Sequence, residues 1–156
     1  MYINAASTIS HQPTFRNKGF SRQLRELAPS SQLITPDYSE FIPPMDRRMM
    51  SDVQKMSIAC SMDCLDQAAV GQPDAIIVGT SMGCCVNTRN FLDKILDANG
   101  GPLSPTSFIV STHNTIAGQI ALLLKNHSYN MTHTQNSLSF EQSLIDGMLW
   151  IKSGFN

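Results

Sequence analysis

The sequence predicts an α/β fold with a mainly parallel sheet flanked by helices. Two stretches, Asp74–Gly79 and Tyr129–Thr134, have the length and composition of strands. Stretches with helical periodicity separate them and follow them. Alternation of strands and helices produces parallel strands joined by crossover helices. The glycine-bounded turn after the first stretch is typical of the place where α/β proteins carry their chemistry.

The remaining segments are expected to surround this sheet. The chain of 156 residues fits one domain. Residues 2–10 alternate weakly and suit a first strand. Residues 12–44 are punctuated by proline and glycine and form an irregular excursion, in which only Phe20–Leu27 looks helical. Further helices are expected at Asp46–Ala69 (with Ser51 and Asp52 as caps), Asn87–Ala98, Asn114–Leu124 and Ser137–Lys152.

Composition points to a partner and away from nucleic acid. Charged residues make up 15% of the chain, against about 25% in typical soluble domains. We therefore expect a partner to cover part of the surface. The net charge is -1, and the only basic cluster is Arg47-Arg48, so neither nucleic acid nor an anionic membrane is expected. No segment approaches the roughly 20 apolar residues of a membrane span.

The cysteines are predicted to be reduced, structural thiols. The N-terminus has no signal-peptide pattern, which makes the cytoplasm the expected compartment. Cys60 and Cys64 share a helical face, and Cys84 and Cys85 are adjacent. Because the sequence has no Cys-x-x-Cys and no histidine at finger-like spacing, we expect neither a metal nor a cofactor.

The turn Gly79-Thr80-Ser81-Met82-Gly83 spells Gly-x-Ser-x-Gly and raises the hypothesis of a nucleophile elbow around Ser81. A small serine hydrolase would need a histidine base and an orienting acid. The candidates are His113, His127 and His133 for the base and Asp93, Asp97 and Asp146 for the acid. The pattern is short, and a structural turn serine is the favoured interpretation.

Several stretches, taken together, resemble the N-terminal half of β-ketoacyl synthases, which belong to the thiolase-like superfamily. The resemblance covers residues 46–154 and implies one such domain over residues 1–156. It rests on the Asp46–Ala69 helix, Asp74-Ala-Ile-Ile-Val-Gly-Thr-Ser-Met-Gly, Asn90-Phe-Leu-Asp, Leu103-Ser-Pro-Thr-Ser-Phe, Asn114-Thr-Ile-Ala-Gly-Gln-Ile-Ala-Leu and Asn130-Met-Thr-His-Thr-Gln-Asn-Ser.

The resemblance also implies where the nucleophilic residue of the family would lie in this chain. Active members of the family carry a cysteine nucleophile where the strand before the last helix turns into that helix, and this position falls on Ser137. No cysteine follows Cys85. The family's C-terminal half supplies further catalytic residues and is expected to be missing here. The segment Leu138-Ser-Phe-Glu-Gln-Ser-Leu144 is similar to synthase-like proteins of aryl-polyene and flexirubin-type pathways.

The resemblance therefore favours a catalytically degenerate member of an acyltransferase family, comparable to chain-length-factor subunits. Such a protein would act in fatty-acid or polyketide-type biosynthesis. It implies a homodimer, or a heterodimer with a complete ketosynthase, formed along Tyr129–Thr134, and contact with an acyl carrier protein. The alternatives are a serine hydrolase using Ser81 and a remnant domain without separate activity.

Overall fold

The computed structural model describes residues 2–22, 24–98 and 101–154. None of the helices in these ranges combines the length and the apolar character that a bilayer crossing requires. The elements are η1 (Phe20–Arg22), η2 (Tyr38–Glu40), α1 (Pro44–Arg47), α2 (Asp52–Ala68), β1 (Ala75–Gly79), α3 (Cys85–Asp97), α4 (Pro105–Ile109), α5 (Thr115–Leu124), β2 (Tyr129–His133), η3 (Asn136–Leu138) and α6 (Ser139–Ser153).

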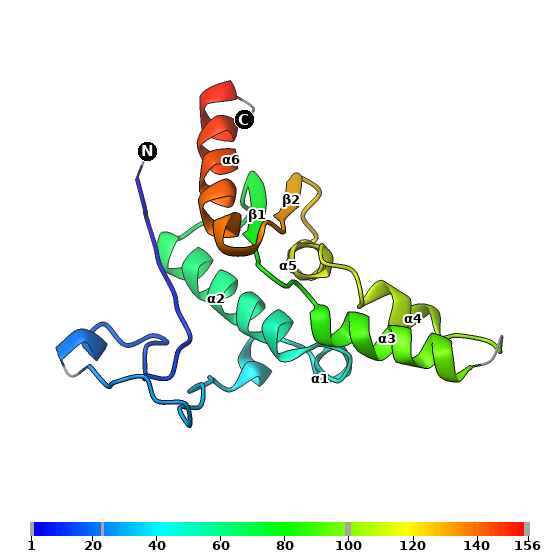
Figure 1. Cartoon of the computed structure of the whole chain (residues 1–156). Helices are drawn as coiled ribbons and strands as arrows, with labels where there is room; N and C mark the ends of the chain where they lie inside the picture. Colours follow the sequence, from blue (N-terminus) through cyan, green and yellow to red (C-terminus); the bar gives the residue numbers. More distant parts are fainter. Residues whose placement is uncertain (1, 23, 99–100, 155–156) are drawn as a thin grey trace.

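A two-stranded parallel sheet lies at the centre of the fold (Figure 1). Its register pairs Ala75 with Tyr129 and Gly79 with His133. Helix α6 packs on one face of the sheet and α5 on the other, and α2 packs against α5. The parallel strands and flanking helices predicted from the sequence are thus confirmed.

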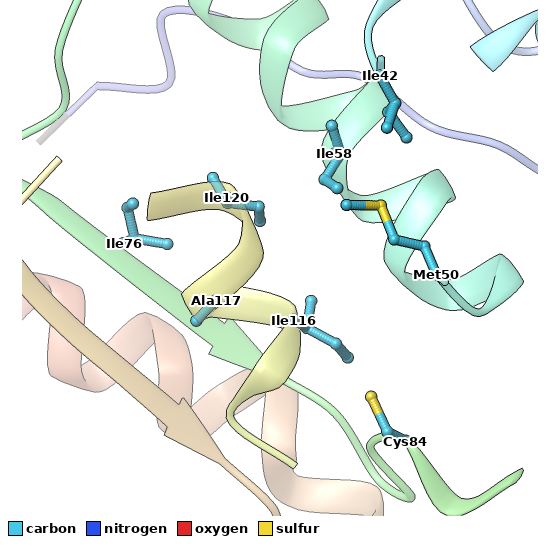
Figure 2. Packing of buried hydrophobic residues seen from close by; sticks show 8 residues of the cluster. All are labelled: Ile42, Met50, Ile58, Ile76, Cys84, Ile116, Ala117 and Ile120. Atoms are coloured by element: carbon cyan, nitrogen blue, oxygen red, sulfur yellow. The ribbon is translucent and has the colours of Figure 1, made fainter. Parts of the chain in front are cut away.

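The buried core lies between β1, α5 and α2, and Figure 2 shows its side chains. Because neighbouring strand residues point to opposite faces, Ile76 contributes to this core while Ile77 lies under α6, next to Gly147. The irregular N-terminal segment adds one fully buried side chain, Ile42, which is 1% exposed. The cluster comprises Ile42, Met50, Ile58, Ile76, Cys84, Ile116, Ala117 and Ile120.

The single helix predicted over Asp46–Ala69 is wrong, because the structure divides it into α1 and α2. Ser51 stands between them as the N-cap of α2, which confirms its predicted capping role. Its backbone N–H donates to Gln54 Oε1 at 2.7 Å and its hydroxyl to the same oxygen at 3.0 Å. These bonds stabilise a new helix start instead of continuing the previous helix.

Two N-terminal predictions are also wrong. Residues 2–10 are not a strand in the structure; they run extended without a strand partner. Of the predicted helix Phe20–Leu27, only the 3-10 turn η1 forms, and Leu24–Leu27 is irregular. A helix of this length is marginal without tertiary packing, and Leu24 and Leu27 are largely exposed.

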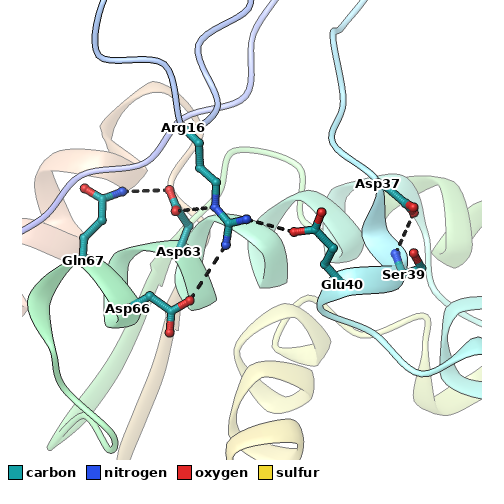
Figure 3. A network of polar contacts seen from close by, with 7 residues as sticks. All are labelled: Arg16, Asp37, Ser39, Glu40, Asp63, Asp66 and Gln67. Atoms are coloured by element: carbon teal, nitrogen blue, oxygen red, sulfur yellow. Dashed lines mark hydrogen bonds and ion pairs between the residues drawn. The ribbon is translucent and has the colours of Figure 1, made fainter.

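A polar network attaches the irregular N-terminal segment to α2 (Figure 3). Arg16 donates from Nε to Asp63 Oδ1 at 3.0 Å and from Nη1 to Glu40 Oε2 at 2.9 Å. Its Nη2 lies 3.9 Å from Asp66 Oδ2, and its guanidinium lies 5.0 Å from the ring centroid of Phe41. One cation therefore joins three parts of the chain.

Candidate functional site

The loops that follow β1 and β2 meet at the carboxyl edge of the sheet, where parallel α/β proteins bind their ligands. The N–H of Thr80 donates to the carbonyl of His133 at 3.0 Å. The hydroxyl of Ser139 lies 3.0 Å from the Thr80 carbonyl and joins the start of α6 to the loop after β1. Both serines proposed from the sequence, Ser81 and Ser137, therefore lie at the same edge.

Ser139 is the structural serine of this edge, and the sequence analysis did not single it out. It is 3% exposed, and its hydroxyl accepts from the N–H of Gln135 at 2.8 Å. The same hydroxyl lies 2.8 Å from the Asn136 carbonyl, so two carbonyls compete for its one proton. Ser139 is the first residue of α6 and not its N-cap, so a capping pattern in the sequence does not mark it.

Ser137 lies in η3, the turn that leads into α6, and is exposed. The preceding residue, Asn136, has φ 51°, in the left-handed region that asparagine tolerates better than most residues. In the part of the chain that the structure describes, no hydrogen bond joins the Ser137 hydroxyl to a base. The turn therefore presents an oxygen nucleophile without a group to deprotonate it.

Ser81 is exposed in the loop after β1. Gly83, with φ 53°, closes this loop through its N–H, which donates to Thr80 Oγ1 at 2.9 Å. The ring of His113 lies where a side chain on Gly83 would stand, so only glycine fits there. His113 is thus held beside the loop, although no hydrogen bond between described residues links it to Ser81.

A second histidine, His133, pairs with a carboxylate, that of Asp146. His133 Nε2 lies 2.9 Å from Asp146 Oδ2, and both side chains are about one-fifth exposed. Because a carboxylate only accepts, the imidazole donates from Nε2. The hydroxyl of Tyr129 also donates to Asp146, at 3.1 and 3.2 Å. Burial, and then the Asp146 carboxylate, raise the pKa of Tyr129 and keep it a donor.

The other residues proposed for a hydrolase do not join this edge. Asp93 lies exposed on α3, where its carboxylate is 4.0 Å from Arg89, and Asp97 is exposed at the end of the same helix. His127 lies before β2 begins, at the opposite edge of the sheet from Ser81. The structure therefore places His133 with Asp146 but assembles no complete Ser-His-Asp triad among the residues it describes.

The thiols near this edge are not arranged for metal binding. Cys84 is 2% exposed, and burial raises its pKa, which disfavours the thiolate. Cys85 is exposed at the start of α3. Within the described ranges, no group of three or more His, Cys, Asp or Glu side chains could hold a metal ion.

Comparison with known families identifies the class of protein. The model of the β-ketoacyl synthase N-terminal domain matches residues 22–156. The chain belongs to this family. The match begins before residue 46, so it also takes in part of the irregular segment. A comparison with curated proteins found no match.

Solved structures show the same fold. The chain is similar to a chain in the complex of the ketosynthase ApeO with its chain length factor ApeC from Xenorhabdus doucetiae. The TM-score is 0.74 at 22% sequence identity, and the alignment covers 94% of this chain and 59% of that one. The fold is therefore that of a thiolase-like N-terminal half, and the chain spans about three-fifths of that protein's length.

Proposed function

We propose that this ketosynthase-like chain is a catalytically degenerate subunit that acts as the partner of a complete synthase in fatty-acid or polyketide-type biosynthesis. One observation carries the proposal. By the resemblance to active synthases, their nucleophilic cysteine is expected at the position of Ser137, and no cysteine occurs after Cys85.

A serine cannot simply replace that cysteine. A thiol next to a helix N-terminus gains nucleophilicity because the local field favours the thiolate, whereas a serine hydroxyl needs a general base. The nearest histidine along the chain, His133, directs Nε2 to Asp146, away from this role. The exposed Ser137 hydroxyl is therefore expected to remain unacylated.

Two uncovered surfaces support a partner role. The edge of β2 opposite β1 has no strand partner in the described part of the chain, and Met131 on that strand is 39% exposed. The outer face of α6 is apolar and also exposed. In the similar solved structure a ketosynthase is bound to its chain length factor. We propose the equivalent pairing here along Tyr129–Thr134, with an acyl carrier protein as a further partner.

Acylation of Ser137 tests the loss of catalysis. The purified chain is incubated with labelled acyl-acyl carrier protein and acyl-CoA, and bound acyl groups are located by mass spectrometry. We expect none on the natural chain. Ser137→Ala is the matched control for non-specific labelling. Acyl transfer to Ser137 that disappears in Ser137→Ala would contradict the proposal of a degenerate subunit.

Co-purification tests the partner role independently. The full chain is mixed with a complete β-ketoacyl synthase from the same organism and separated by gel filtration. We expect a joint peak larger than either protein alone. A chain that melts cooperatively and elutes as a monomer beside the synthase would exclude the pairing. A chain that does not melt cooperatively would instead support the remnant-domain alternative.

One contact favours a second candidate function, a serine hydrolase using Ser81. The His113 ring is held against Gly83, two residues from that serine. A fluorophosphonate probe distinguishes this function from the first. Labelling that is lost in Ser81→Ala would support a hydrolase, and an unlabelled folded chain would remove it.

A further inference from the structure

Two thiols of α2 lie beneath the N-terminal segment. Cys60 and Cys64 are about one helical turn apart, and both are partly buried. The segment reaches them through Ser7, whose hydroxyl lies next to Cys60 and whose backbone N–H faces the sulfur of Cys64. Burial raises the pKa of both thiols, which disfavours the reactive thiolate. The position of the segment therefore bears on the reactivity of these two cysteines.

The same segment covers a buried carboxylate. Ser7 also lies near Asp63, whose side chain is 4% exposed. Arg16 Nε donates to Asp63 Oδ1 at 3.0 Å, and Gln67 Nε2 donates to Oδ2 at 2.8 Å (Figure 3). Of these two donors only the arginine carries a charge that can compensate the carboxylate. Removing one partner of a buried ion pair leaves an uncompensated charge in the interior. The closed position of the segment over Asp63 therefore depends on Arg16.

The contact between the segment and α2 is loosely packed. A cavity of about 440 Å³ lies between them, lined by residues from 6–8 and 14–18 and by Asp63 and Gln67 of α2. The amide of Gln67 lies a long 3.5 Å from the Ala6 carbonyl. The Thr8 carbonyl accepts from Thr14 Oγ1 at 2.9 Å, a bond within the segment itself. Residues 6–16 are thus joined to one another and can move as one unit.

We propose that residues 6–16 form a releasable cover over the thiols of Cys60 and Cys64, and that the ion pair between Arg16 and Asp63 holds this cover closed. When the pair is broken, the Asp63 carboxylate gains free energy by reaching water, and the cover lifts. Both thiols then meet solvent on one face of α2, where a thiol-reactive compound can reach them. This device does not depend on the proposed partner role.

Alkylation of the four cysteines in the full chain tests the cover. The folded chain is treated with iodoacetamide, and the rate at each cysteine is followed by tandem mass spectrometry. Cys85, which is exposed, and Cys84, which is 2% exposed in the core, are internal references. Because local opening exposes only what the cover protects, we expect Arg16→Gln to speed alkylation of Cys60 and Cys64 at least about tenfold. The rates at both reference cysteines should not change.

A double substitution separates the buried charge from the mere loss of a contact. Arg16→Gln combined with Asp63→Asn removes the charge together with its partner, so no carboxylate is left that must reach water. We expect this variant to alkylate both covered thiols at close to the natural rate. The control is Arg47→Gln, which removes a 3.8 Å ion pair to the exposed Asp37 in the same segment and should change no rate.

Three results would overturn the proposal. The first is a folded Arg16→Gln chain in which Cys60 and Cys64 react at the natural rate. The second is acceleration of Cys84 to the same degree, since the opening would then be global. The third is a double variant that reacts as fast as Arg16→Gln. If Arg16→Gln does not melt cooperatively, Arg16→Lys replaces it, because lysine keeps the charge but loses the forked donors; unchanged rates at both covered thiols would overturn the proposal there too.

Discussion

Gly79, the last residue of β1, lets the first turn of α6 approach the sheet. A side chain at this position would overlap the backbone carbonyl of Ser139 and would lie 3.0 Å from Ser143 Oγ. The first of these obstacles is backbone, so it cannot rotate away. Gly147, in the same interface, differs because a methyl group there would lie 3.7 Å from Ile77, an ordinary contact.

Gly79→Ala should therefore lower the free energy of unfolding by about 1–3 kcal/mol, the usual cost of forcing atoms into packed space. Gly147→Ala is the matched control. It should be neutral or stabilising by up to about 1 kcal/mol, because alanine favours the helix. Urea unfolding curves of the two variants measure both values. Equal destabilisation by both changes would contradict this account of the interface.

Asp63 is a charged residue in a nearly closed environment, 3% exposed. Burial alone would raise its pKa, but the hydrogen bonds from Arg16 and Gln67 and the nearby Ser7 hydroxyl together outweigh burial and lower the pKa. A carboxyl group with a lowered folded-state pKa stabilises the fold above its unfolded pKa. That stabilisation is lost as the pH falls through the folded-state pKa.

Stability should consequently depend on Asp63 at neutral pH and not in acid. We expect Asp63→Asn to cost about 1–3 kcal/mol at pH 7, because it weakens charged hydrogen bonds. The difference from the natural chain should shrink as the pH falls below about 4. Unfolding curves between pH 2 and pH 7 would measure it. Asp66→Asn, which changes an exposed partner of the same arginine, should have little effect at any pH. A difference between Asp63→Asn and the natural chain that stays constant with pH would contradict the lowered pKa of Asp63.

Among the elements, α6 exposes most of its apolar side chains. Its sheet-facing side carries Trp150, which stacks on Tyr129 with ring centroids 4.4 Å apart, together with small or polar residues such as Ser139, Gly147 and Asp146. Its outer side carries the exposed apolar residues Phe140, Leu144, Ile145, Met148, Leu149 and Ile151. A surface helix normally turns most of its apolar side chains inward, so this outer side is the surface that the proposed partner role would use.

Leu149→Lys tests this role of α6. Leu149 is 57% exposed, so the substitution should change the free energy of unfolding by less than about 0.5 kcal/mol. It should nevertheless weaken co-elution with a complete synthase and reduce binding of a hydrophobic dye. The control is Leu122→Lys on α5, at 70% exposure. If both variants bind the synthase equally well, the outer side of α6 is not the interface.

Across the whole molecule, the sequence predicted those helices and strands that are marked by local patterns within their own residues. The ranges of β1, β2, α5 and α6 agree closely with expectation because apolar spacing and helix stops are local. Residues 2–10 were predicted wrongly because alternation says nothing about a strand's partner. The hydrogen bond between His133 and Asp146 could not be predicted either, because it depends on how α6 crosses β2 and not on the spacing of the two residues in the sequence.

The pairing of β1 with β2 also sets the order in which the molecule can fold. The paired residues Ala75 and Tyr129 are more than 50 positions apart, and three helices lie between them. Contacts this distant in sequence slow folding, because a long loop must close before they form. During synthesis the sheet cannot close until β2 has left the ribosome, so α2 and α5 must hold β1 in a partly built core until then.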